Sequence, residues 1–226
     1  MVRFIALVVI VLASAAGASA GAPAGGLAEL VAEGERWWKS SPDPRDPVAC
    51  ATCHYDPAET RGWAASFPKY RPLPPPEGRV MTLFQANAEA VQRHYRLPDA
   101  ERPALAITAY LTSHGAGTPI SPGIVAGQAV FESRLRALAE SVARGERLYA
   151  RWCRSCHDAG AVTPAALLFP AAGNGQVESL ERFLGRHRPE LPRLGSDGQP
   201  STDVIAFLMS RLAGRPVSVA PFSVAP

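Results

Sequence analysis

The four cysteines of the chain fall into two short motifs that combine two thiols with an imidazole. The motifs are Cys50-Ala51-Thr52-Cys53-His54 and Cys153-Arg154-Ser155-Cys156-His157. Two cysteines three positions apart lie on one side of a helical turn, and the histidine follows directly. This arrangement suits three kinds of chemistry: covalent attachment of a haem through its two vinyl groups, half of a zinc site, or a redox-active dithiol.

We interpret both motifs as c-type haem attachment sites, because each ends in histidine and they lie in different halves of the chain. A zinc site built from the four cysteines would leave both histidines unused and would require the halves to meet. Disulfides are a further alternative. The haem interpretation predicts two covalently bound haem c groups. The attachment residues and proximal iron ligands are then Cys50, Cys53 and His54 for one haem, and Cys153, Cys156 and His157 for the other.

Residues 1–20 have the three-part layout of a secretory signal peptide. They contain a positive start at Arg3, an apolar run over residues 4–13 and a small-residue cleavage site at Ala18-Ser19-Ala20. The run is about half of the ~20 residues that a membrane span requires, so we expect cleavage, with an uncleaved anchor as the alternative. We therefore predict a periplasmic protein that has no membrane span after cleavage. Free cysteines normally pair in such an oxidising compartment, and haem attachment prevents that pairing.

The charge balance excludes a nucleic-acid partner. The 226 residues include 23 basic and 20 acidic side chains, which give a formal net charge of +3. This excess is too small for a nucleic-acid surface. The lysines are Lys39 and Lys69 alone, so any cationic docking patch must be built from arginine.

Both halves of the chain repeat one order of elements around their motif. Apolar residues at helical spacing precede the motifs in residues 27–38 and 138–149, and follow them in residues 107–115 and 205–214. A turn-rich run of glycine and proline separates the halves. We predict an all-α fold of two tandem helical domains joined by a Pro/Gly-rich linker. The expected boundaries are 1–20 for the signal peptide, 26–118 for the first domain, 119–136 for the linker, 137–216 for the second domain and 217–226 for the tail.

This order resembles the cytochrome c family. The resemblance rests on Gly34-x-x-Trp37-Trp38 ahead of the first motif and Gly145-x-x-Leu148-Tyr149 ahead of the second, and it covers about residues 26–214. It implies that the first and last helices of each half cross at the glycine, packed by an aromatic residue of the last helix. The implied pairs are Gly34 with Tyr110 and Gly145 with Phe207.

The second axial ligand of each iron decides the function, since methionine, histidine and an open position give different chemistry. Residues 83–94 and 178–187 each predict a short amphipathic helix that ends in histidine. His94 and His187 are therefore ligand candidates, and solvated surface histidines are the alternative. Met81 and Met209 are further candidates; Met209 fits a core position better, and Met81 fits a buried helix start equally well. His114, past the last helix of the first half, is the weakest candidate.

The first half also resembles the SoxA-type dihaem cytochromes of bacterial thiosulfate oxidation. The segments that carry this resemblance are the first cysteine motif, Phe67-Pro68-Lys69-Tyr70 and Gly78-Arg79-Val80-Met81-Thr82-Leu83. It implies a haem-ligating cysteine seven residues after the leucine, where this chain has Ala90. We do not carry over the sulfur-oxidising activity, because that cysteine is missing. The same offset from Leu180 reaches His187, and His94 lies one turn past Ala90.

These observations predict an exported dihaem cytochrome that carries electrons between periplasmic redox partners. Two fully ligated irons leave no open coordination position, which favours a carrier over a catalyst. The alternative is a haem redox enzyme or subunit, of the sulfur-oxidation or peroxidase-like sort, with one open or unusually ligated haem. Tyr70, Arg71 and Arg93 are then candidates to line that site. A gas-binding module is the third possibility.

Overall fold

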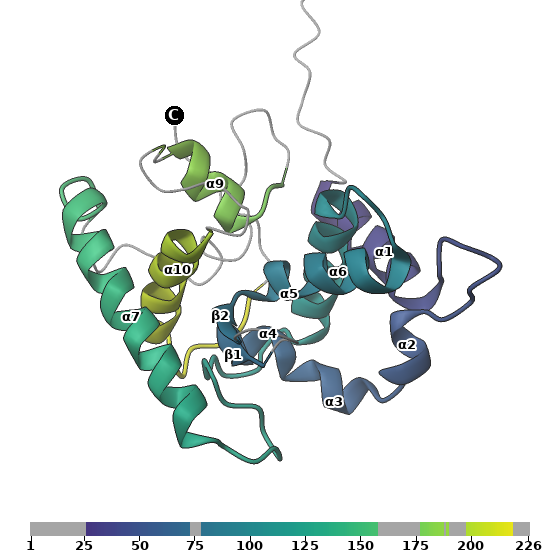
Figure 1. Ribbon diagram of the computed structural model, residues 1–226, viewed down its shortest axis with the longest axis horizontal. Coiled ribbons are helices and arrows are strands. Elements are labelled where there is room, and N and C mark those ends of the chain that lie inside the picture. The colour runs from purple at the N-terminus through teal and green to yellow at the C-terminus, as the bar shows by residue number, and fades with distance from the viewer. Residues whose placement is uncertain (1–25, 73–77, 158–176, 188, 190–197, 219–226) are drawn as a thin grey trace, which may run out of the picture.

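The computed structural model describes residues 26–72, 78–157, 177–187, 189 and 198–218, drawn in colour in Figure 1. The expected signal peptide and most of the expected tail lie outside the described residues. The described part is helical except for one two-stranded antiparallel hairpin, which confirms the predicted all-α class. Within it, no helix combines the length and the apolar character that crossing a bilayer demands.

The elements of the first half surround its cysteine motif. In chain order they are α1 (Gly26–Lys39), α2 (Cys50–Cys53), α3 (Pro57–Arg61), α4 (Trp63–Ser66), β1 (Lys69–Arg71), β2 (Arg79–Met81), α5 (Leu83–Ala90), the π-helical turn η1 (Val91–Tyr95) and α6 (Glu101–His114). The described elements of the second half are α7 (Glu132–Trp152), α9 (Leu180–His187) and α10 (Gln199–Arg211).

Each half is organised by a close crossing of its first and last helices, and the two pairs are visible in Figure 1 as α1 with α6 and α7 with α10. A Cβ atom placed on Gly34 would lie 1.9 Å from the carbonyl oxygen of Ala106. A Cβ atom on Gly145 would lie 1.8 Å from the carbonyl oxygen of Asp203. Both distances are far below van der Waals contact, so only glycine permits either crossing.

The aromatic residues at these crossings are those that the family resemblance implied. The same hypothetical Cβ atoms would lie 2.8 Å from the Cβ of Tyr110 at Gly34 and 3.0 Å from the Cβ of Phe207 at Gly145. The α7–α10 crossing is also fixed by the buried Asp203 carboxylate, which accepts a hydrogen bond from Ser141 Oγ at 2.6 Å. The repeat seen in the sequence is therefore a repeat of three-dimensional packing.

The two halves share buried side chains. Ile107 and Leu111 of α6 belong to the same apolar cluster as Val204 and Ile205 of α10. A smaller cluster joins Val80 of β2 to Leu138 of α7 and Ala206 of α10. The hairpin that carries Val80 therefore packs on the helices of the other half.

The chain between the halves is attached to the first half by backbone hydrogen bonds. Ser121 N donates to the carbonyl oxygen of Ala65 at 2.8 Å, and Gly123 N donates to that of Ser66 at 2.8 Å. Further along, α7 begins at Glu132. The connecting segment is thus held against the end of α4.

Candidate functional site

The first cysteine motif forms the short helix α2 and the residue that follows it. His54 N donates to the carbonyl oxygen of Cys50 at 2.9 Å, which continues the helical turn. Cys50 is half-buried and Cys53 is exposed, and both line the same cavity as His54. The His54 ring is held by two aromatic neighbours: Trp38 stacks on it at 6.0 Å between ring centres, and Trp63 meets it edge-on at 4.8 Å.

A cavity of about 150 Å³ opens beside this motif. Cys50, Cys53 and His54 line one part of it, and His94 lines another. The helix face expected from residues 83–94 forms the wall of this cavity that carries His94. From that face Leu83, Asn87, Ala90, Val91 and His94 all line the cavity. The structure therefore brings His54 and His94 to one largely apolar space.

His94 lies in an unusual backbone segment. The helix α5 ends at Ala90 and continues as the π-helical turn η1, which ends at Arg96 in the left-handed region with φ 55°. Isolated π-helical turns are rare in proteins and occur frequently at functional sites.

The second cysteine motif follows α7 directly. Cys153 is buried at the C-cap of the helix and Cys156 is exposed. His157 N donates to the carbonyl oxygen of Cys153 at 2.9 Å, the same contact that His54 makes in the first motif. The Tyr149 hydroxyl donates to the carbonyl oxygen of His157 at 3.2 Å.

The His157 imidazole faces that of His187, which ends α9. Their ring centres lie 6.1 Å apart, with 60° between the ring planes. Two imidazoles bound to one metal ion through bonds of about 2 Å place their ring centres about 6 Å apart. Phe183 stacks on His187 at 5.1 Å and orients its ring. The chain thus holds two imidazoles at the spacing that a shared iron requires.

The other candidate ligands lie away from these sites. Met81 is fully buried in β2, directly before α5. His114 Nε2 lies 2.8 Å from the carbonyl oxygen of Pro57. Neither residue lines the cavity that contains His54.

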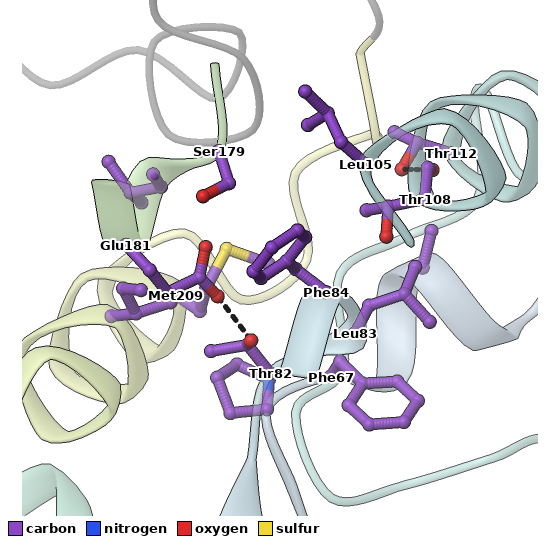
Figure 2. A pocket seen from close by; sticks show the side chains of 14 residues that line it. Phe67, Thr82, Leu83, Phe84, Leu105, Thr108, Thr112, Ser179, Glu181 and Met209 are labelled. Carbon is purple, nitrogen blue, oxygen red and sulfur yellow. Dashed lines mark hydrogen bonds between the residues drawn. The ribbon is translucent and has the colours of Figure 1, made fainter. Parts of the chain in front are cut away.

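Met209 lines a second, smaller cavity of about 50 Å³ between the halves, together with the buried carboxyl of Glu181. Figure 2 shows this carboxyl turned toward the Thr82 hydroxyl, which donates a hydrogen bond to it. Burial raises the pKa of Glu181 above its usual value. The cavity contains no histidine among the described residues that line it.

Two of the alternatives for the cysteine motifs, disulfides and a shared zinc site, can be compared with the described residues. All four cysteines are free of disulfides. Among the residues that the structure describes, no group of three or more histidine, cysteine or acidic side chains is arranged to hold a metal ion. The two motifs therefore do not meet as a four-cysteine zinc site would require.

Sequence reasoning missed the residues that support the motifs from a distance. Trp63 contacts the His54 ring, and Tyr95 contacts Cys50 across 45 positions of sequence. Neither belongs to a motif, so no local pattern could have identified them. Tyr95 adjoins His94, but helical periodicity does not reveal that the turn there is π-helical.

Comparison with known proteins identifies the second half most directly. Residues 140–201 match the family model of the cytochrome c oxidase, cbb3-type, subunit III family. The crystal structure of SoxXA from P. pantotrophus is similar over 85% of this chain and 76% of that chain, with a TM-score of 0.59 and 17% sequence identity. No curated protein sequence matches the chain. Residues 140–201, which include the second cysteine motif, are thus similar to a cytochrome c-type family, and the all-α fold is similar to that of SoxXA.

Proposed function

We propose that the chain is an exported dihaem c-type cytochrome that carries electrons between periplasmic redox proteins. The cytochrome c-type domain and the SoxXA-like fold support haem-based electron transfer. The observation that carries the proposal is the pairing of each motif histidine with a second histidine. His54 shares a cavity with His94, and His157 faces His187 at 6.1 Å.

In the first site, Cys50 and Cys53 would hold the haem covalently, and His54 and His94 would bind its iron. The residues fit the group, since two thiols and two imidazoles border a cavity whose other walls are mainly apolar. Trp38 and Trp63 fix the His54 ring, and the apolar walls exclude water. When bound, the haem supplies one-electron exchange at its iron.

In the second site, Cys153 and Cys156 would hold the haem covalently, and His157 and His187 would bind its iron. The Tyr149 hydroxyl donates to the backbone carbonyl of His157, and the Phe183 ring stacks on His187. Residues 158–176, which follow the motif, lie outside the described residues. We assign Met81 and Met209 to the core, because both side chains are buried and neither lines the cavity that contains His54.

Spectroscopy of the mature protein tests this proposal. After expression with a cytochrome c maturation system, we expect two covalently bound haems per chain, both low-spin when oxidised. The reduced protein should not bind carbon monoxide, because imidazoles occupy both axial positions of each iron. One haem per chain, or colourless protein, would overturn the dihaem proposal. Sequencing of the mature N-terminus tests cleavage after Ala20.

Replacement of His94 separates the carrier from its alternative. In the carrier, His94→Ala opens the first iron and yields one haem per chain that binds carbon monoxide. The alternative is a redox enzyme or subunit with an open first haem, and it is favoured by the SoxXA-like fold and by the polar Arg71 and Asn87 on the cavity wall. In that case the unmodified protein already has a high-spin haem that binds carbon monoxide or peroxide.

A further inference from the structure

We propose that Tyr95 is a positioning residue for the distal ligand of the first haem. Its hydroxyl ties the π-helical turn that carries His94 to both α1 and the first cysteine motif. The inference rests on the proposed function, since it assumes that His94 binds the iron.

The Tyr95 hydroxyl makes contacts to two other segments of the chain. It donates a hydrogen bond to the carbonyl oxygen of Trp37, at 2.6 Å. It accepts one from the backbone N–H of Cys50, at 3.3 Å. The Cys50 sulfur lies 3.3 Å from the same oxygen. One buried hydroxyl therefore joins α1, α2 and η1.

Both backbone partners lie at helix ends, where hydrogen-bonding groups have no partner within the helix. Cys50 is the first residue of α2, and Trp37 lies in the last turn of α1. Tyr95 satisfies an amide and a carbonyl that the two helices leave without a partner, in a partly buried place.

The π-helical turn η1 requires contacts from other segments of the chain to keep its conformation. A π-helical turn is rarely adopted, and Arg96 leaves this one in the left-handed region with φ 55°. The His94 side chain is exposed, and no hydrogen bond to its ring is found among the described residues. The backbone of η1, and thus the Tyr95 contacts next to it, sets where the His94 imidazole lies.

Ligand placement of this kind has a narrow tolerance, since metal–ligand distances hold to about ±0.2 Å. Loss of the hydroxyl should let η1 relax and lengthen or break the bond to His94. The effect should be confined to the first haem, because the second site has its own tyrosine contact, from Tyr149 to the carbonyl of the proximal His157.

The test is Tyr95→Phe in the full-length protein carrying both haems. This change removes one oxygen and keeps the ring that packs at 6.1 Å from the Trp37 ring. We expect a high-spin fraction in the oxidised spectrum and carbon monoxide binding by up to one haem per chain. A redox titration should show a shifted potential for one haem and an unchanged potential for the other.

Tyr149→Phe is the matched control, because it removes a buried hydroxyl that contacts a backbone carbonyl in the second site. It should leave the first haem low-spin and closed to carbon monoxide. Two low-spin haems with unchanged potentials in Tyr95→Phe would overturn the proposal, even if the variant unfolds more easily, because the role would then be structural. A variant that holds only the second haem also contradicts it, since the hydroxyl would then act on haem attachment.

The assumption beneath the inference is tested separately. If His94→Ala leaves both haems low-spin, His94 is not a ligand, and the ligand assignment fails whatever Tyr95→Phe shows. If His94→Ala opens the first haem and Tyr95→Phe does not, the proposed function stands and the positioning role is rejected.

Discussion

The two imidazoles of the second site, from His157 and His187, lie close together in space but belong to different segments of the chain. His157 follows the second cysteine motif, His187 ends α9, and their rings already lie at the separation of two ligands on one iron. A ring so placed contributes little to packing, since both side chains are exposed. Their separation is compatible with the proposal that both bind one iron.

We therefore expect His187→Ala to open the second haem. The variant should have one high-spin haem in its oxidised state and bind one carbon monoxide per chain when reduced, as an absorbance titration can measure. His114→Ala is the control, because His114 contacts the carbonyl of Pro57 in the first half and does not line the cavity that contains His54. A variant lacking His187 with an unchanged spectrum would remove this residue from the ligand set.

The helices are the elements best predicted from the sequence, because the spacing of apolar residues and of glycines can be read within short stretches of the chain. The helices that end in His94 and His187 were expected from their apolar faces, and both lie within a residue or two of their predicted ends. The hairpin β1–β2 was not expected, since strands of three residues carry no readable alternation. Met81 was interpreted as a buried helix start or a ligand, and it lies in β2.

The tight helix crossings predict that an alanine at Gly34 or Gly145 destabilises the protein, whereas an alanine at a glycine with open space around it does not. Gly145→Ala places a methyl group where the Asp203 carbonyl oxygen lies, so α7 and α10 must separate. We expect a loss of about 1–3 kcal/mol or more in the free energy of unfolding, as overpacking typically costs. Gly34→Ala should act alike on α1 and α6. Chemical denaturation followed by circular dichroism measures both.

Gly62→Ala is the matched control for these substitutions. A Cβ atom there meets nothing within 4 Å, and the backbone has φ −80°, which alanine adopts freely. We expect a change between zero and a gain of about 1 kcal/mol, because alanine restricts the unfolded chain more than glycine does. Equal losses at Gly62 and Gly145 would show that the crossing is not the cause.

At the scale of the whole molecule, the cavity between the halves contains the buried carboxyl of Glu181. Its burial favours the uncharged form of the group. Burial raises the pKa of Glu181 in the folded protein above the 4.5 of an ordinary glutamate. The folded state then holds this proton more tightly than the unfolded state does, so stability falls as the pH rises above about 4.5 towards the folded-state pKa. The contribution is fully present only below the unfolded pKa.

Glu181→Gln should remove this dependence, because an amide is neutral at every pH and its oxygen can still accept the Thr82 hydrogen bond. We expect the variant to gain stability relative to the unmodified protein as the pH increases from 4.5 to 8, measured as the free energy of unfolding across that range. Glu132→Gln controls for the loss of one negative charge, since Glu132 is exposed at the start of α7. A parallel pH profile for both variants would contradict the prediction.

The core that runs through both halves has a kinetic consequence. Ile107 and Leu111 pack in one cluster with Val204 and Ile205, so interlocked side chains set the spacing between the two proposed haem sites and no hinge has to close. Electrons passing from one iron to the other would therefore cross a constant gap. We expect the intramolecular rate to be independent of solvent viscosity, whereas two modules on a swinging tether would slow as glycerol is added.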